Sequence, residues 1–229
     1  GTMLASAALT YMNRYGALPC NKPVVVTNND WAYETARTFK AHGAEVTVVD
    51  TRKTVPEDLG TEMAHLGIEV LADSTVTGVS GKHRVKGVSV AAKNADGSGI
   101  AGVSHSIDAD GLIVSGGYSA AVHLFCHVGG KLSFDDARVS FMPATGRKAL
   151  ACVGGTAAEF GIAAAIDGGA AAGAKAAQAA GFKPGRAGKG VQVADDRADG
   201  NVEAAWLLPS GTAPNRSKAK FFVDYQNDT

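Results

Sequence analysis

One segment, residues 22–52, constrains the fold of this chain more than any other. It opens with three β-branched residues, Val24 to Val26, and passes through the polar turn Thr27–Asp30 into a run with apolar residues at helical spacing. A second apolar stretch, residues 46–49, then leads to Asp50. Strand, tight turn, helix and strand in this order predict a βαβ unit. The continuous apolar runs indicate strands buried on both faces, as in a parallel sheet.

The turn after the first strand decides whether this unit can bind a nucleotide. Dinucleotide-binding units have G-x-G-x-x-G here, so that the backbone can approach a pyrophosphate at the helix N-terminus. This chain has Asn28, Asn29 and Asp30 instead. Asparagine tolerates the positive φ of such a turn, but its side chain fills the space that glycine leaves open. Asp30 is expected to be the N-cap of the helix, where its charge would also repel phosphate.

The acid expected to bind ribose is nevertheless in place. Asp50 lies 20 residues beyond Asp30, and Arg52 follows two residues later. The architecture of a nucleotide site is therefore kept while its phosphate chemistry is weakened. Two interpretations stay open: these residues still bind a nucleotide, or they are the structural remnant of such a site.

The chain continues with alternating helical and strand patterns. Residues 3–15 and 57–66 predict helices, residues 68–71 and 110–115 predict strands, and the β-rich stretches 74–80, 84–92 and 102–107 predict a three-stranded antiparallel crossover. We expect that crossover to cover one face of the parallel sheet, where a simpler fold would have a helix.

Two glycine pairs in the second half are candidate cofactor contacts. Gly116 and Gly117 follow the strand 110–115, and Gly154 and Gly155 follow a predicted last buried strand, residues 149–153. An alanine-rich helix is predicted directly after the second pair, so that its N-terminus can point at a pyrophosphate. The alternative is that both pairs are ordinary turn glycines. Shorter predicted elements are a helix over 119–125, two β pieces near 132–134 and 141–143, and the alanine-rich helix over 157–180.

Composition narrows the class of protein. The 229 residues carry net charge +0, which argues against nucleic acid or an acidic membrane surface as the main partner. The three cysteines form no C-x-x-C, and their odd number fits a reducing cytoplasm. His123 and His127 are four residues apart, but packing explains them better than a metal site does. We expect neither a metal nor a catalytic residue, and no signal peptide or membrane span is evident.

The order of the elements predicts an α/β fold, a three-layer ββα Rossmann-type domain of the FAD/NAD(P)-binding, disulfide-reductase-like kind. In such folds a nucleotide domain is inserted into a flavin-type domain. Four segments are expected: a connecting helix (1–22), an inserted NAD-type βαβ domain with a β-meander (23–109), the incomplete C-terminal half of the flavin/NAD-type domain (110–182), and a linker (183–229). The chain reads as a piece of something longer, with Gly1-Thr2 as an expression remnant, and Trp206-Leu207-Leu208 and residues 220–224 as an anchor and a further strand.

Several motifs carry a resemblance to a known family. TYMNRYGALP, VVVTNNDWAYETA, VVDTR, VSGGYSAAVHLF, GKLSFDD and FFVDYQND resemble the α (large) subunit of heterotetrameric sarcosine oxidase over essentially the whole chain. The wider relatives are α subunits of amine- and imino-acid-oxidising complexes. VSGGYSAAVHLF and TNNDWAY are specific to that subunit, whereas the glycine pairs alone are not.

This resemblance implies a complex that oxidatively demethylates sarcosine to glycine, forming hydrogen peroxide and passing a one-carbon unit to tetrahydrofolate. It implies NAD bound by the whole α subunit, and FAD and FMN held by other subunits or interfaces. It also implies tetrahydrofolate on a C-terminal domain, with residues 183–229 as the linker towards that folate-binding domain, and β, γ and δ subunits as partners. The isolated chain should then be inactive, and a homodimer would be one way to cover exposed sheet edges. The alternatives are a docking module that binds no cofactor, or the α subunit of a related amine or imino-acid dehydrogenase. A free-standing NAD(P)H reductase is disfavoured, because the glycine fingerprint and a redox cysteine pair are missing.

Overall fold

The computed structural model describes residues 1–97, 99–146, 150–183 and 200–205, together with 185, 193, 207–208 and 220–221. Contacts divide the chain into two compact units. The first comprises Gly1–Gly117 with Glu203–Thr229, and the second comprises Tyr118–Val202.

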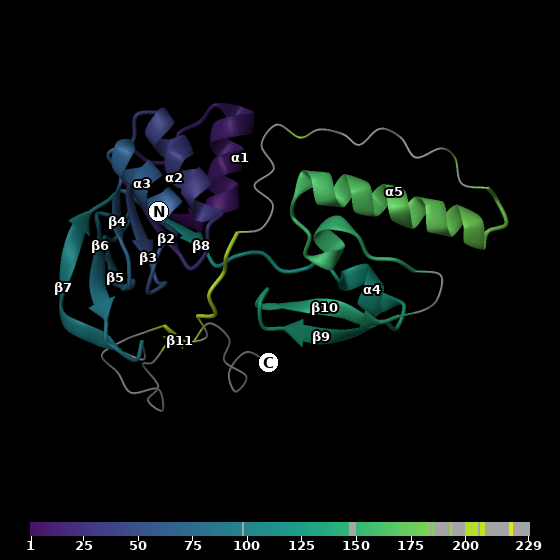
Figure 1. The fold of residues 1–229 in the computed structure, drawn as a ribbon. Helices are drawn as coiled ribbons and strands as arrows, with labels where there is room; N and C mark the ends of the chain where they lie inside the picture. The colour runs from purple at the N-terminus through teal and green to yellow at the C-terminus, as the bar shows by residue number, and fades with distance from the viewer. Residues whose placement is uncertain are drawn as a thin grey trace. The chain divides into compact units, whose positions relative to one another are not determined.

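A five-stranded parallel sheet is the centre of the first unit (Figure 1). Its strands, in spatial order, are β1 (Thr2–Leu4), β8 (Gly111–Ser115), β2 (Pro23–Thr27), β3 (Thr47–Asp50) and β4 (Glu69–Leu71). Val25 of β2 pairs with Val48 on one side and Ile113 on the other, so β-branched residues fill the middle of the sheet. The buried apolar runs recognised in the sequence are therefore these central strands.

Helices cover one face of this sheet. They are α1 (Ala5–Tyr15), α2 (Ala32–Ala41) and α3 (Glu57–His65). Their core joins Val25, Val48 and Ile113 of the strands to large side chains of the helices. Phe39 of α2 and Met63 of α3 are fully buried in it. Burial of side chains of this size stabilises the contact by roughly 1.5–3 kcal/mol each.

An antiparallel meander covers the opposite face. It consists of β5 (Ser74–Ser80), β6 (Gly87–Lys93) and β7 (Ile100–Asp108), paired in that order. Val88 and Val90 of β6 alternate towards the sheet and pack with the residues whose side chains leave its second face, among them Val24 and Val49. The predicted three-layer ββα arrangement and its α/β class are confirmed.

Two strands differ from the sequence-based expectation. The first residues form β1 before the helix begins at Ala5, because Thr2 to Leu4 pair in parallel with β8. Residues 110–115, expected in the second half, form β8 between β1 and β2. Since β8 is hydrogen-bonded to the βαβ unit itself, the first compact unit extends to Gly117 and does not end at residue 109.

The second unit is small and has little buried surface. Its elements are α4 (His123–His127), β9 (Lys131–Asp135), β10 (Ser140–Thr145), the 3₁₀ turn η1 (Gly154–Ala157) and α5 (Ile162–Ala179). β9 and β10 form an antiparallel hairpin, as the two predicted β pieces suggest. Phe125 is buried between Gly130 and Gly146, and a Cβ on either glycine would lie within 2.6 Å of its ring.

Several predictions for the second half are wrong in their bounds or type. Residues 150–153 form no strand, and Leu150 is 41% exposed, whereas residue 149 lies outside the described residues. The alanine-rich helix starts at Ile162, and among its described residues none is buried. The short helix is shifted to His123–His127. An apolar run becomes a buried strand only where partner strands receive it, and none is paired with residues 150–153 in the described part of the chain.

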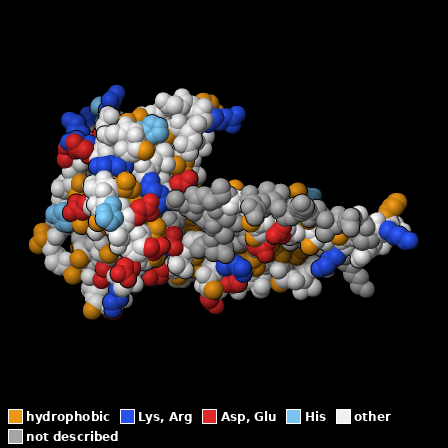
Figure 2. All heavy atoms as spheres, turned by 45° about the horizontal axis from the view of Figure 1, so that its top comes forward, with side chains coloured by type: hydrophobic (Ala, Val, Ile, Leu, Met, Phe, Trp, Pro, Cys, Tyr) orange, Lys and Arg blue, Asp and Glu red, His pale blue; other side chains and the backbone are white. Residues whose placement is uncertain are grey.

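Near the end of the chain, β11 (Leu207–Leu208) and β12 (Lys220–Phe221) pair in antiparallel fashion. Trp206 and residues 222–224, expected as an anchor and as the rest of a strand, lie outside the described residues. Figure 2 shows acidic and basic side chains interspersed over the surface of the first unit.

Candidate functional site at the carboxyl edge of the parallel sheet

The carboxyl ends of three central strands bring polar residues into one row. Thr27 ends β2, Asp50 ends β3 and Ser115 ends β8, and the register pairs Thr27 with both of the others. In open parallel sheets ligands bind outside this edge. The sequence-predicted residues 28–30, Asp50 and Arg52 are all brought together here.

Asp50 is completely buried and is held by Arg52. The Arg52 guanidinium donates to the carboxylate from Nε, 3.0 Å from Oδ1, and from Nη2, 2.7 Å from Oδ2. The backbone N–H of Arg52 also donates to Oδ1, at 2.9 Å. The remaining guanidinium nitrogen, Nη1, donates to Asp30. Both acids that the sequence singles out therefore contact one arginine within the protein.

Tyr33 completes this network from the helix side. Its hydroxyl donates to Asp50 Oδ2 at 2.8 Å, and its ring lies 6.0 Å from the Arg52 guanidinium carbon. Burial raises the pKa of the Tyr33 phenol, and the charge of Asp50 raises it further. Burial alone would lower the pKa of Arg52, but hydrogen bonds to Asp50 and Asp30 outweigh it and the pKa rises. The phenol thus remains a donor and the guanidinium remains charged.

Asn29 is fixed by hydrogen bonds to the ends of β2 and β8. Its backbone N–H donates to Thr27 Oγ1 at 3.0 Å, and that hydroxyl donates in turn to Asn29 O. The side-chain amide donates to Ser115 O at 3.0 Å and to Asn28 Oδ1 at 2.9 Å. Asn29 Oδ1 accepts from the Ser115 hydroxyl. Asn29 has 0% exposed surface, so it is a structural tie between β2 and β8.

Asn28 pairs with a segment distant in the sequence. Its side-chain Nδ2 donates to Glu203 O at 2.7 Å, and its own carbonyl accepts from Glu203 N at 2.9 Å. The two residues thus form a reciprocal pair of hydrogen bonds that uses only main-chain atoms of Glu203. The side-chain amide and the carbonyl of Asn28 are therefore bonded within the chain itself.

Helix α2 does not begin as the sequence predicts. Its N-cap is Trp31 and no side chain caps it, whereas Asp30 was expected in that role. The Asp30 carbonyl accepts from Tyr33 N, and the carboxylate turns to Arg52. An ion pair with a buried guanidinium is the stronger interaction for a carboxylate than a cap on exposed amides.

The two glycine pairs have separate environments. Gly117 has φ +92°, which explains glycine there, and Gly116 is exposed. Gly154 also has positive φ, and a Cβ on it would lie 3.1 Å from Ala165 Cβ. Gly154 and Gly155 form the turn η1 instead of ending a strand before a helix N-terminus. Gly155 O accepts from Ala121 N at 2.9 Å, and helix α5 begins only at Ile162, so no α-helix follows this pair directly.

Sequence reasoning missed Tyr33, Thr27 and Glu203 as members of this edge. The helical spacing of α2 places Tyr33 on its buried face, which was a usable signal for a contact with the strands. No local pattern links Asn28 to Glu203, because the pairing spans 175 positions.

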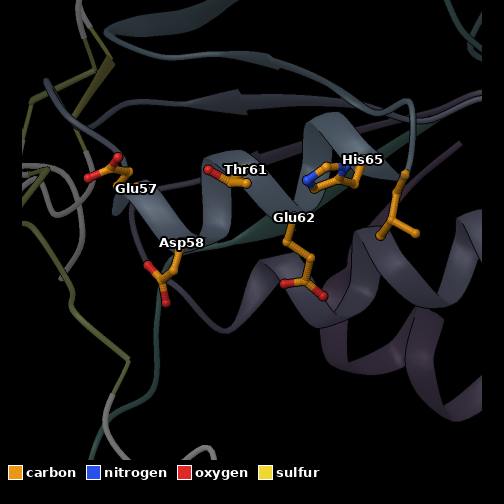
Figure 3. A pocket seen from close by; sticks show the side chains of 6 residues that line it. Glu57, Asp58, Thr61, Glu62 and His65 are labelled. Atoms are coloured by element: carbon orange, nitrogen blue, oxygen red, sulfur yellow. The ribbon is translucent and has the colours of Figure 1, made fainter.

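A shallow hollow on α3 does not offer an alternative site. Figure 3 shows its side chains projecting from one helix; the lining residues are Glu57, Asp58, Thr61, Glu62, His65 and Leu66. Three of them are acids, which repel phosphate, and Glu62 already pairs with Arg37 at 2.7 Å. Within the described ranges no three potential metal-ligating side chains gather, and no helix is long and apolar enough to cross a membrane.

The fold defines the class of protein. Residues 24–97 match the family model described as pyridine nucleotide-disulphide oxidoreductase. The chain superposes on L-proline dehydrogenase from P. horikoshii with TM-score 0.51, at 18% identity over 81% of this chain and 31% of that one. It superposes on T. acidophilum thioredoxin reductase with TM-score 0.53, at 15% identity over 78% and 57%. The first unit therefore has the FAD/NAD(P)-binding fold of the disulfide-reductase type.

Sequence comparison identifies a narrower group of relatives than the fold does. The whole chain is 29% identical to sarcosine oxidase subunit alpha of Rhizobium meliloti (strain 1021), and 34% identical to that of Corynebacterium sp. (strain P-1). The chain spans 21% and 23% of the length of these two relatives. The resemblance found from sequence motifs is confirmed.

The residues of this edge do not fit the dinucleotide that the fold class implies. A pyrophosphate needs open backbone at the turn, and a ribose needs an accessible acid. Here Asn28 and Asn29 are bonded within the protein, and Asp50 has no exposed surface. A dinucleotide could enter only if these bonds were broken.

Proposed function

We propose that this chain is the dinucleotide-fold part of the α subunit of a sarcosine-oxidising complex. Such a complex, an oxidoreductase acting on a CH–NH donor, demethylates sarcosine to glycine, with hydrogen peroxide formed and a one-carbon unit passed to tetrahydrofolate. The observation that carries this proposal is similarity along the whole chain to three sarcosine oxidase α subunits.

The proposal includes the cofactors and partners of the whole protein. NAD would be bound by the complete α subunit, with Gly116–Gly117 and Gly154–Gly155 as candidate contacts. FAD and FMN would be held through other subunits or interfaces, and tetrahydrofolate by a C-terminal domain. The partners would be β, γ and δ subunits in the cytoplasm.

This segment would act as scaffold and not as the centre of chemistry. The three cysteines are free thiols in the structure, so they supply no disulfide to reduce. The network around Asp50 holds its charges in fixed pairs and leaves them no proton-transfer role. The isolated chain should therefore not oxidise sarcosine.

A second candidate is a docking module that binds no cofactor, and the self-bonded sheet edge favours it for the first unit. A related amine or imino-acid dehydrogenase α subunit is a further alternative. Which amine or imino acid is oxidised would be determined by the whole complex.

The test uses the complete subunit that contains this segment, assembled with its partner subunits. The proposal predicts that the complex forms hydrogen peroxide with sarcosine as substrate, and proline is assayed separately for comparison. The 229-residue chain alone should show no activity. An assembled complex that oxidises proline but not sarcosine would support the dehydrogenase alternative. Calorimetry showing no NAD binding by the complete subunit would favour the docking module.

A further inference from the structure

We infer that the chain closes its own dinucleotide edge: residues 203–205, here called the strap, are bonded through Glu203 to Asn28 of the turn Asn28-Asn29-Asp30, where a pyrophosphate would otherwise lie. This goes beyond the proposed function, because it concerns which part of the fold is closed to nucleotide. It would hold whichever amine the complex oxidises.

The first argument is the form of the contact. Asn28 both donates to and accepts from the main chain of Glu203, at 2.7 and 2.9 Å. Glycine at this position could accept through its carbonyl but could not donate from a side chain. The asparagine that departs from the glycine pattern is therefore the residue that holds the strap.

The second argument is that the layer beneath the strap is also closed. Asn29 is buried and ties β2 to Ser115 of β8. Arg52, a cation at this edge of the sheet, is 4% exposed and bonded to Asp50 and Asp30. A phosphate arriving here would meet carboxylates and bonded amides.

The buried polar side chains at this edge also have hydrogen-bond partners within the protein. Buried donors and acceptors in folded proteins are nearly always paired, because an unpaired one loses its bonds to water without replacement. The side-chain amides of Asn28 and Asn29 and the carboxylate of Asp50 meet this requirement without a ligand.

The pairing is tested with three variants of the full chain. Asn28→Asp is isosteric and sets a carboxylate oxygen against the Glu203 carbonyl, while Glu203→Pro removes the donating N–H. Glu203→Ala is the matched control, because the pairing does not use the exposed Glu203 carboxylate.

The readout, measured by NMR, is hydrogen exchange of the two paired groups, the Glu203 backbone amide that donates to Asn28 O and the Asn28 side-chain amide that donates to Glu203 O. Asn28→Asp should raise the exchange of the Glu203 amide about tenfold, and Glu203→Pro should raise that of the Asn28 side-chain amide about tenfold, as expected when one bond of the pair is lost. Glu203→Ala should leave both unchanged. If Asn28→Asp and Glu203→Pro each left the remaining amide of the pair exchanging at the rate of the unaltered chain, the inference would be overturned.

The closure to nucleotide is tested by adding NAD at millimolar concentration to the unaltered chain. Neither the strap nor residues 27–30 should change in exchange. Faster exchange of the strap together with protection of residues 27–30 would show that NAD displaces it, and would overturn the inference. Neither result depends on sarcosine oxidation, so failure here is distinct from failure of the proposed function.

Discussion

Arg52 is the residue on which the carboxyl edge of the sheet depends most. Its guanidinium contacts two carboxylates and lies by the ring of Tyr33, and its side chain is 5% exposed. A buried carboxylate such as Asp50 is tolerated only while it is paired. The account therefore makes Arg52 a structural residue and not a ligand for a nucleotide.

Replacing Arg52 should destabilise the fold strongly. Arg52→Met leaves Asp50 charged and buried without its main partner, and the expected loss is about 3–5 kcal/mol in the free energy of unfolding, measured in urea. Arg37→Met is the control within the same unit, because Arg37 pairs with Glu62 at a partly exposed position. That change should cost less than about 1 kcal/mol. Equal costs for the two variants would contradict the role given to Arg52.

Cys20 should behave as a buried thiol. It is 8% exposed, and burial raises the pKa of its thiol to about 11, with the charge of Asp110 adding to the effect. Because the thiolate is the reactive form, Cys20 should resist alkylation at neutral pH until the chain unfolds, whereas the exposed Cys126 should react at once. Mass spectrometry after timed alkylation distinguishes the two sites.

The same pKa shift gives a pH dependence. The native thiol keeps its proton up to about pH 11, whereas an unfolded cysteine loses it near 9.0. Between these two pH values the unfolded state therefore binds fewer protons than the native state. The contribution of Cys20 to the free energy of unfolding is fully present below pH 9 and is lost as the pH rises through 11. In urea titrations across that pH range, the free energy of unfolding of Cys20→Ala should decline less steeply with pH than that of the unaltered chain. An identical slope would exclude Cys20 as its source.

At the scale of elements, the meander is held by its turns as well as by its core. Gly81 lies in the turn between β5 and β6 with φ +126°, and a Cβ there would lie 1.9 Å from Arg84 O. That contact is with backbone, so it cannot be relieved by turning a side chain. In contrast, Gly60 lies inside α3 with nothing near its Cβ position.

These two glycines give opposite predictions. Gly81→Ala should destabilise the first unit by about 1–3 kcal/mol, because the turn must leave its conformation. Gly60→Ala should stabilise it by about 0.5–1 kcal/mol, because alanine favours the helix. Thermal unfolding followed by circular dichroism measures both, and a stabilised Gly81→Ala would contradict the turn described here.

The strands also show which parts of the fold can be predicted from the sequence. Val24 to Val26 predict β2 because an uninterrupted run of β-branched residues favours a strand over a helix. The alternation of Val88 and Val90 predicts the meander. β1 escapes prediction because three residues pair with β8, more than a hundred positions away. The strand at residues 149–153 is predicted wrongly for the converse reason, since apolar character alone does not supply a neighbouring strand.

At the scale of the whole molecule, class and site are predictable to different degrees. The order of elements and the motifs yield the disulfide-reductase-type fold and the resemblance to sarcosine oxidase α subunits, and both are confirmed. The residues of the edge, Asn28 to Asp30 with Asp50 and Arg52, are also found together. What spacing could not show is that they bind one another, because Tyr33, Ser115 and Glu203 reach them only in the folded chain.

The central claim is that this edge is satisfied from within the protein. The measurement that tests it most directly is a titration of the ¹⁵N-labelled 229-residue chain with NAD, followed at the backbone amides of Asn28, Asn29 and Asp30 and at the Arg52 Nε–H. The account predicts that these four signals keep their positions up to millimolar NAD, and that the buried Arg52 Nε–H exchanges slowly with water. Saturable shifts of the turn amides together with rapid exchange at Arg52 would contradict it.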